Sequence, residues 1–436
     1  MKSDWRAHYA NKIVTSAVAV KAIESHQRVV LGHACAEPPA IVRALAARAA
    51  ELRDVEIVHM VVMGPLPFSE PDMERSFRLN GMFLGPPTRD PVRDARATFT
   101  PCFFSEVPRL FRERILPIDA VILQVTEPDG EGYCSLGLSA DFTLAATECA
   151  PLVLAQVNRL LPRTGGARIH LDHISAIVEE ESPIPEVFAP KIGELEMQIG
   201  RHVASLVEDG ATLQIGIGAI PEAALLCLHE KKDLGIHSEM FSDGVVTLAQ
   251  AGVITNRRKT LNPDKFVATF LMGTRRLYDW AQNNPALEML PVDYVNDPSV
   301  IGQHDKMISL NSALQVDLLG QVNAEMIGAR QYSGVGGQVD FLRGASRSRG
   351  GRGIIALPST ARQGTISRIC TALDTGAAVT SSRQDVHFVV TEYGVAELRG
   401  KTLQQRAEAL ISIAHPAHRA GLRLSAGSDG RPARDI

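Results

Sequence analysis

"LQIGIGAIPEAALLCL", residues 213–228, decides the fold class of this 436-residue chain. An apolar run of strand type enters a Gly-x-Gly turn, and a proline then precedes an Ala/Leu-rich helix. "VVLGHACAEPPAIVRAL" (29–45) has the same order, and a second strand follows each copy, "EIVHM" at 56–60 and "GIHSEM" at 235–240. Strand, helix and strand in succession favour a parallel sheet, so we infer an α/β protein made of two similar domains in tandem.

The same alternation continues along the chain. Further strand-like runs include "AVILQV" and "RIHL" in the first half and "KFVATFL", "IIALP" and "HFVVTEYG" in the second. "VEEESPIPEVFAP" (178–190) has neither helical nor strand periodicity and is the best candidate linker. We expect an N-terminal domain over 1–185 and a C-terminal domain over 190–436, with mostly parallel sheets and the active site in the cleft between the domains.

Composition and charge exclude several classes of function. The chain is 45% hydrophobic with a net charge of −4, so no general field attracts it to nucleic acid or anionic lipid. The polar start "MKSDWRAHYANK" and the lack of a long apolar run predict a cytoplasmic protein without a membrane span. The cysteines form no CxxC pair and no cluster with histidine, which predicts no metal site and reduced, mostly buried thiols at Cys35, Cys102, Cys134, Cys149, Cys227 and Cys370.

The Gly216–Gly218 turn is the first candidate for binding. Glycines before a helix start let a ligand approach the free backbone N–H groups, where the helix dipole is positive, so the turn suits an anion or a cofactor. It is not the dinucleotide fingerprint, because Pro221 stands where the third glycine would fall. The alternative is a tight strand-to-helix turn that binds nothing.

Glu239 is the candidate for chemistry. It follows Gly218 by 21 residues, at the end of the next strand, and the carboxyl ends of adjacent parallel strands share one crevice. A partly solvated carboxylate in such a place can act as a base or a nucleophile. The alternative is a glutamate that caps or salt-bridges a loop. His237 lies two residues earlier on the expected strand and points to the same face, but no nucleophile motif accompanies it, so we expect a core histidine.

A second glycine-rich turn occurs in "YSGVGGQVDFLRGA" (332–345). Its backbone N–H groups, with the amide of Gln338, are suited to stabilising an oxyanion near a reacting carbonyl; the alternative is a turn whose glycines serve only its geometry. The arginines that follow in "RGASRSRGGRG" (343–353) suit phosphate groups or form an ordinary solvated loop.

Taken together, these segments resemble the acetyl-CoA hydrolase/transferase family, most closely its 4-hydroxybutyrate CoA-transferase branch. The resemblance spans nearly the whole chain and rests on the segments above together with "EPDGEGYCSLGLSADF", "AQVNRLLPRTGG" and "VTEYGVAELRGKTLQQRAEALISIAHPAHR". It implies two tandem domains of the CoA-transferase fold and a catalytic glutamate, which here is Glu239. By the same match, the implied CoA and thioester contacts are Gly216, Ile217, Gly218, Ala219, Ile220, Gly336, Gly337, Gln338 and Asn311.

The resemblance also implies a mechanism. The carboxylate of Glu239 attacks an acyl-CoA thioester, a glutamyl-CoA thioester follows, and an acceptor carboxylate completes a ping-pong cycle with no metal and no tightly bound cofactor. The implied substrates are an acyl-CoA and a short-chain acid such as 4-hydroxybutyrate, butyrate, succinate or itaconate, and a homodimer is the default assembly. The alternatives are an acyl-CoA hydrolase, in which water resolves the thioester, and a noncatalytic acyl-CoA-binding protein.

Overall fold

The computed structural model describes residues 5–426 and has the expected mixed α/β architecture with mostly parallel sheets. The chain divides into two compact units. The first combines the chain up to Val187 with Val267–Val295, and the second combines Phe188–Phe266 with the chain from Asn296 onward. The first crossing falls at Val187, within a stretch over 180–193 that is neither helix nor strand. Segment 267–295 returns to the first unit, a feature that two consecutive domains would not have.

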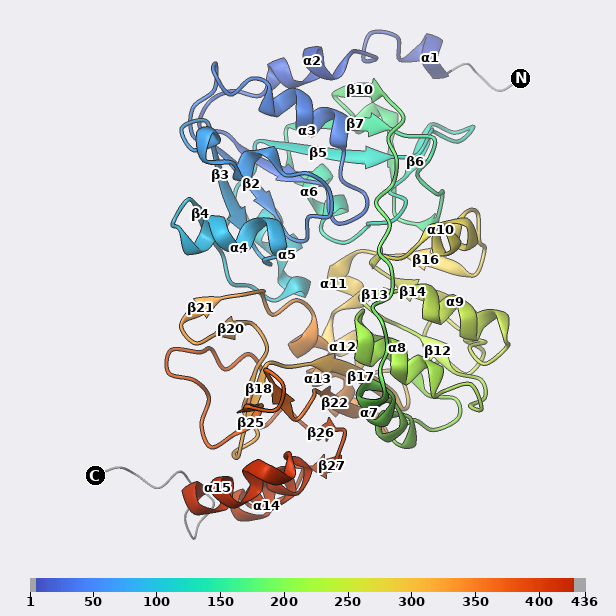
Figure 1. Cartoon of the computed structure of the whole chain (residues 1–436). Helices are drawn as coiled ribbons and strands as arrows, with labels where there is room; N and C mark the ends of the chain where they lie inside the picture. The colour runs from blue at the N-terminus through green and yellow to red at the C-terminus, as the bar shows by residue number, and fades with distance from the viewer. Residues whose placement is uncertain (1–4, 427–436) are drawn as a thin grey trace. The chain divides into compact units, whose positions relative to one another are not determined.

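A seven-stranded sheet forms the centre of the first unit, and each of its strand pairings is parallel. Apolar side chains predominate on both faces of its inner strands, as is typical of parallel sheets covered by helices. Helix α3 (Pro39–Ala46) packs beside α2 (Ser16–Ala19) and against β7 (Figure 1). In spatial order the strands are β10 (Ala176–Glu179), β7 (Leu152–Val157), β5 (Ala120–Val125), β1 (Arg28–Leu31), β2 (Val55–His59), β3 (Phe77–Gly81) and β4 (Ala97–Phe99).

The returning segment is tied to the first unit by backbone hydrogen bonds. The amide of Ala140 donates to the carbonyl of Thr269 at 2.8 Å, and that of Ala167 donates to Met289 at 2.8 Å. The ring of Phe270 lies against buried His33, with 4.7 Å between the ring centres. The elements of this segment are β14 (Phe266–Ala268), β15 (Phe270–Leu271), α10 (Arg275–Ala281), β16 (Leu287–Met289), which pairs with β8 (Gly165–Gly166), and α11 (Val292–Val295).

The remaining helices and strands of the first unit are short. Strands β6 and β9 pair antiparallel, and the helices α4, α5 and α6 connect strands of the main sheet. Their bounds are α1 (Trp5–His8), α4 (Pro86–Arg93), α5 (Val107–Arg112), β6 (Tyr133–Ser135), α6 (Thr143–Cys149) and β9 (Arg168–His170), with single 3-10 turns at Val20–Ala22, Pro67–Ser69, Pro71–Met73, Phe104–Glu106 and Leu171–His173.

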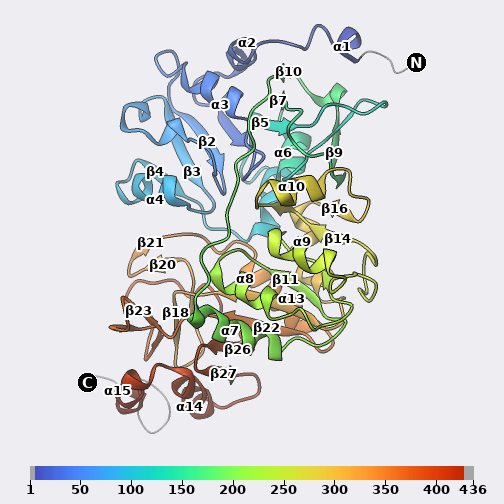
Figure 2. The ribbon, with the colours of Figure 1, turned by 45° about the vertical axis from the view of Figure 1, so that its right-hand side comes forward.

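A six-stranded sheet forms the centre of the second unit. All its pairings are parallel except the last, between β26 and β27. Helices α7 (Glu194–Ser205) and α8 (Ala219–Leu226) lie side by side and contact its strands (Figure 2). The strand order is β12 (Gly235–Ile236), β11 (Thr212–Ile215), β17 (Met307–Ser312), β22 (Arg352–Ala356), β26 (Phe388–Thr391) and β27 (Gly394–Glu397).

Other helices and several two-residue strands complete the second unit. Leu410 and Ile411 of α14 belong to an apolar core that also contains Ile355 and Val389 of the sheet. The bounds are α9 (Asp243–Gln250), α12 (Pro298–Ile301), α13 (Gln338–Arg347), α14 (Leu403–Ile413), α15 (Pro416–Ala426), β13 (Met240–Phe241), β18 (Gln315–Asp317), β19 (Val322–Asn323), β20 (Met326–Ile327), β21 (Arg330–Gln331), β23 (Thr360–Ala361), β24 (Ile366–Ser367) and β25 (Ile369–Cys370).

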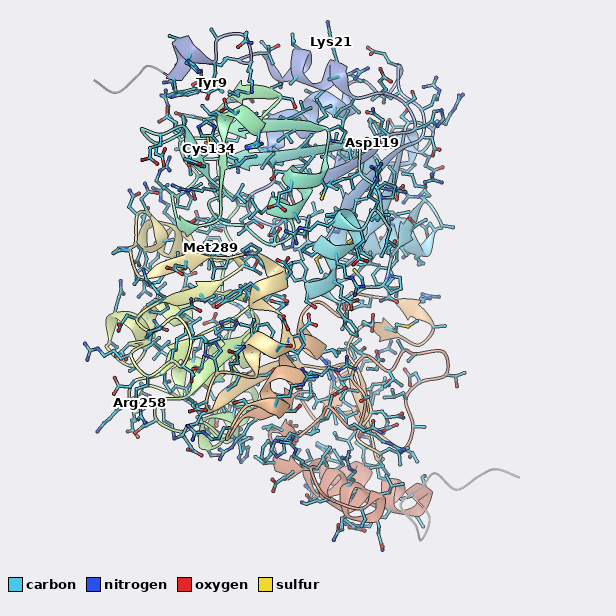
Figure 3. The ribbon with its side chains drawn as sticks, turned by 180° about the vertical axis from the view of Figure 1, so that it is seen from behind. Tyr9, Lys21, Asp119, Cys134, Arg258 and Met289 are labelled. Carbon is cyan, nitrogen blue, oxygen red and sulfur yellow. The ribbon has the colours of Figure 1, made fainter. Side chains whose placement is uncertain are left out.

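The six cysteines are all free, but the expectation that most are buried is wrong. Only Cys35 and Cys134 are buried, and Figure 3 labels Cys134 on β6. Burial raises the pKa of both thiols to about 12, so they stay protonated at neutral pH. None of the helices between Trp5 and Ala426 is long and apolar enough to cross a membrane. Over the same residues, no group of His, Cys, Asp and Glu side chains is arranged to hold a metal ion.

Candidate active site

The carboxyl edge of the second unit's sheet holds the two main candidate elements. Strands β11 and β12 are adjacent and parallel, with Thr212 opposite Gly235, so their carboxyl ends lie at the same edge. The first of these strands leads into Gly216–Gly218 and the second into Glu239. Strand β17, on the other side of β11, ends near Asn311 at this edge too. Ligand sites of open α/β sheets form outside the carboxyl ends of the strands.

Glu239 lies in a bend between β12 and β13 and is half-buried. Buried Ser238 holds this bend: its hydroxyl oxygen accepts from the amide of Ile215 at 3.1 Å and donates to the carbonyl of Met240 at 2.6 Å. Strand β12 ends at Ile236 and is shorter than the strand expected over 235–240. His237 and Glu239 are therefore not alternate residues of one strand. The ring of His237 is buried and lies 4.5 Å from that of His304, as a core histidine would.

A buried amide orients the carboxylate of Glu239. The Nδ2 of Asn296 donates to Oε2 of Glu239 at 2.7 Å, and Asn296 is completely buried in the turn before α12. A carboxylate only accepts, so this contact fixes which way the amide faces. Helix α12 itself packs tightly on α13. This close approach requires glycine at position 344, because a Cβ there would overlap the side chain of Ile301. The position of Asn296 is thus set by helix packing.

The predicted glycine turn also reaches Glu239. Gly336 has a left-handed backbone, with φ +54°, and Gly337 follows it as the N-cap of α13. A Cβ on Gly337 would overlap both Oε2 of Glu239 and Nδ2 of Asn296. The carboxylate therefore lies against the start of a ten-residue helix. The positive end of the helix dipole favours negative charge there.

Gln338 is the first residue of α13 and is buried. Its side-chain Nε2 donates to the hydroxyl oxygen of Ser381 at 3.0 Å, which directs the amide nitrogen toward that serine. Asn311 is likewise held within the protein, since its Nδ2 lies 3.0 Å from Oε1 of Gln214 and 2.9 Å from Oγ of Ser309. The asparagine that donates to the carboxylate is Asn296, a residue that no motif in the sequence indicates.

The Gly216–Gly218 turn is open and shaped for glycine. Nothing lies within 4 Å of the position a Cβ would take on Gly216, and Ile217 is 43% exposed. Gly218 has φ +118°, a conformation that favours glycine, and is the N-cap of α8. The helix begins at Ala219, two residues before Pro221, so the backbone N–H groups of the first two helical residues are available to an anion.

Three of the four arginines in the segment 343–353 pair with carboxylates. Arg343 lies 3.5 Å from Asp385, Arg352 lies 2.8 Å from Glu208, and Arg349 forms a short pair with Asp305. The first part of this segment is the end of α13, so it is not wholly a loop. These pairs favour the reading of an ordinary charged surface over that of a phosphate site.

Comparison with known proteins gives a consistent result over nearly the whole chain. Residues 1–188 match the family model of the acetyl-CoA hydrolase/transferase N-terminal domain, and residues 273–426 match that of the C-terminal domain. The chain is 56% identical over 420 residues to the 4-hydroxybutyrate coenzyme A transferase of Clostridium kluyveri, covering 96% of this chain and 98% of the relative. It is 43% identical to the succinyl-CoA:cyclohexane-1-carboxylate CoA transferase of Geobacter metallireducens, covering 98% and 97%.

A solved structure agrees with these relatives. The crystal structure of 4-hydroxybutyrate CoA-transferase from Porphyromonas gingivalis is similar to this chain, with a TM-score of 0.84 and 43% identity. The match covers 97% of this chain and 98% of that one.

Proposed function

The chain belongs to the acetyl-CoA hydrolase/transferase family and is a CoA-transferase, and we propose that it works through a covalent thioester on Glu239. The donor is an acyl-CoA of the acetyl or succinyl type, and the acceptor is a short-chain acid such as 4-hydroxybutyrate, butyrate or itaconate. One observation carries the proposal: the carboxylate of Glu239 is held by buried Asn296 at 2.7 Å, against the start of α13.

The proposed chemistry uses the carboxylate as a temporary substrate. An oxygen of Glu239 attacks the thioester carbonyl, the C–S bond breaks, and an acyl-glutamyl anhydride and CoA thiolate form. The thiolate then attacks the glutamyl carbonyl, which releases the donor acid and leaves CoA joined to Glu239 as a thioester. The acceptor carboxylate attacks this thioester and expels CoA thiolate, which gives a second acyl-glutamyl anhydride. The thiolate then attacks the acyl carbonyl of the acceptor, which forms the new acyl-CoA and releases the carboxylate of Glu239. Every step exchanges one acyl bond for another, so the cycle needs no ATP and no resident cofactor.

The surrounding groups have roles that fit these steps. Asn296 and the start of α13 hold the carboxylate in one orientation and stabilise its negative charge in the resting enzyme. Gly337 lies beside the reacting carboxyl group, and the backbone N–H groups of Gly336 and Gly337 are the proposed donors to the oxyanion. The N–H of Gln338 donates to the carbonyl of Val335 at 3.3 Å and helps to hold this turn. The open turn from Gly216 to Ile220 is the proposed seat for CoA, with Asn311 at the same edge of the sheet. The proposed enzyme is a homodimer and acts in the cytoplasm.

A trapping experiment tests the intermediate directly. The protein is incubated with acetyl-CoA alone, treated with borohydride or hydroxylamine, digested, and analysed by mass spectrometry. We expect the modification on the peptide that contains Glu239, because a thioester without an acceptor accumulates in a ping-pong cycle. Omission of acetyl-CoA is the control. Turnover with no modified Glu239 would contradict the proposal.

The same preparation separates transfer from hydrolysis. If the enzyme is a transferase, added butyrate should be converted to butyryl-CoA while little free CoA is released. If water resolves the thioester, free CoA should accumulate at a rate that butyrate does not raise. Free CoA is measured with a thiol reagent, and product acyl-CoA is measured by chromatography.

Replacement of Asn296 by alanine should lower kcat by about 10- to 100-fold, since a hydrogen bond to a charged group contributes about 1.5–3 kcal/mol. Asn296→Asp should lower it further, because a second negative charge would face Glu239. Asn311→Ala is the comparison, and its hydrogen bonds to Gln214 and Ser309 predict a smaller effect on kcat. Steady-state kinetics decide: a larger loss in the Asn311 variant would reverse the assignment.

A further inference from the structure

Helices α8 and α9 are joined by a buried polar contact that the proposed chemistry does not use. Glu222 of α8 is 7% exposed, and its Oε1 accepts a short hydrogen bond from the hydroxyl of Ser242, which is also 7% exposed. The two helices pack against each other in the second unit (Figure 2). Glu222 follows Ile220 by two residues, and Ser242 follows Glu239 by three. The contact therefore links the neighbourhoods of the turn and of the nucleophile.

The serine departs from its usual local role. Ser242 is the N-cap of α9, a position where a serine oxygen normally accepts a hydrogen bond from the first turn of its own helix. It makes no such cap, and its hydroxyl donates to Glu222 instead. The loss of a cap lowers the stability of a helix. A local rule broken in this way is expected at functional sites.

The other oxygen of Glu222 is enclosed as well. A Cβ on Gly244 would lie 2.5 Å from Oε2 of Glu222 and 2.7 Å from Cδ1 of Leu225, so glycine is needed for this close approach. Burial raises the pKa of Glu222, the charge of Asp243 adds to the shift, and the hydrogen bond from Ser242 opposes it. An apolar side chain would fill the same space without the desolvation cost of a carboxyl group. Packing alone therefore does not explain the residue.

We propose that Glu222 is a positioning residue, which through Ser242 fixes the segment carrying Glu239 relative to the turn that holds CoA. This inference rests on the proposed function, because it concerns the distance between a bound thioester and its nucleophile. Reaction between bound groups needs near-contact geometry, and a displacement of about 1 Å can cost roughly 100-fold in rate. A rigid, buried link between the two elements supplies such geometry before the substrate arrives.

Four variants test the link. Glu222→Ala and Ser242→Ala each remove it, whereas Glu222→Gln keeps an acceptor oxygen for the serine. Ser348→Ala is the matched control, since Ser348 is also 7% exposed and donates to a buried carbonyl, that of His304, but lies beside Met307 at the amino end of β17. The control and Ser242→Ala should lower the melting temperature by similar amounts. Only the link variants should change the kinetics.

We expect Glu222→Ala and Ser242→Ala to lower kcat by about 10- to 100-fold with a smaller change in KM for acyl-CoA. Glu222→Gln should recover to within about fivefold of wild type, because Gln can accept the same hydrogen bond. The rate at which acetyl-CoA labels Glu239 should fall in parallel with kcat. Link variants that differ from wild type no more than Ser348→Ala does would overturn the positioning role.

The outcome can be separated from a failure of the proposed function. Labelling of Glu239 in the wild-type protein tests the nucleophile, whatever the variants do. Wild-type labelling with unchanged rates in Glu222→Ala and Ser242→Ala would reject the link and leave the nucleophile standing. No wild-type labelling would reject the proposed chemistry itself.

Discussion

Glu239→Ala should reduce CoA transfer to below about one thousandth of the wild-type rate, because removing the attacking group of a covalent mechanism leaves only binding contributions. Glu239→Gln should be as inactive, since an amide cannot form the anhydride although it keeps nearly the same shape. The near-isosteric variant excludes a packing defect as the cause. Rates are measured as acyl-CoA exchange between a labelled acid and an unlabelled donor.

Glu239→Asp adds a test of reach. It keeps the charge but withdraws the carboxylate by one methylene, and we expect about a hundredfold loss from the misplacement. Glu208→Ala is the control: it removes ion pairs with Lys306 and Arg352 before β11, at the amino end of the sheet, and should keep full activity. Activity of Glu239→Asp within threefold of wild type would argue against a nucleophile. Unchanged CoA transfer in Glu239→Ala would show that the reaction does not use this carboxylate.

Gly337→Ala should cost at least about 100-fold in kcat, although it adds only one methyl group. The backbone of Gly337 has φ −95°, which alanine adopts without strain. The effect must therefore come from the overlap of the new Cβ with Oε2 of Glu239 and Nδ2 of Asn296. One of these side chains has to leave its position, and the hydrogen bond between them is lost. Steady-state kinetics and the rate of Glu239 labelling should fall together.

A second glycine provides the control for this prediction. Gly421 lies within α15, and nothing is within 4 Å of the position its Cβ would take. Gly421→Ala should leave the kinetics unchanged and stabilise the helix by about 0.5–1 kcal/mol. Near-normal kcat in Gly337→Ala, in a protein with an unchanged melting temperature, would mean that Glu239 and Asn296 do not hold their arrangement during catalysis.

Much of the architecture could be predicted from local sequence patterns. The alternation of apolar runs and amphipathic helices identified the parallel sheets, since both faces of an inner strand must be apolar. The placement of Gly216–Gly218 and Glu239 at one edge of the sheet followed from the rule for adjacent parallel strands. These inferences need only neighbours in the sequence and the regular geometry of a strand.

The residues that were missed depend on packing between distant segments. Asn296 follows Glu239 by 57 residues, and its own surroundings, "YVNDPS", resemble an ordinary helix start. Its place beside the carboxylate is set by the contact of α12 with α13, which no local pattern shows. The same holds for segment 267–295, which pairs with strands of the first unit although it follows much of the second in sequence. Long-range pairing of this kind has no periodic signal.

That returning segment has a consequence for biosynthesis. When Val187 leaves the ribosome, the first unit still lacks β16 and the partners of Ala140 and Ala167, which lie among the next 108 residues. At about 5–20 residues per second, translation of these residues takes roughly 5 to 20 seconds, during which the first unit is incomplete. The incomplete first unit must therefore avoid aggregation while most of the segment that carries Glu239 is still being translated.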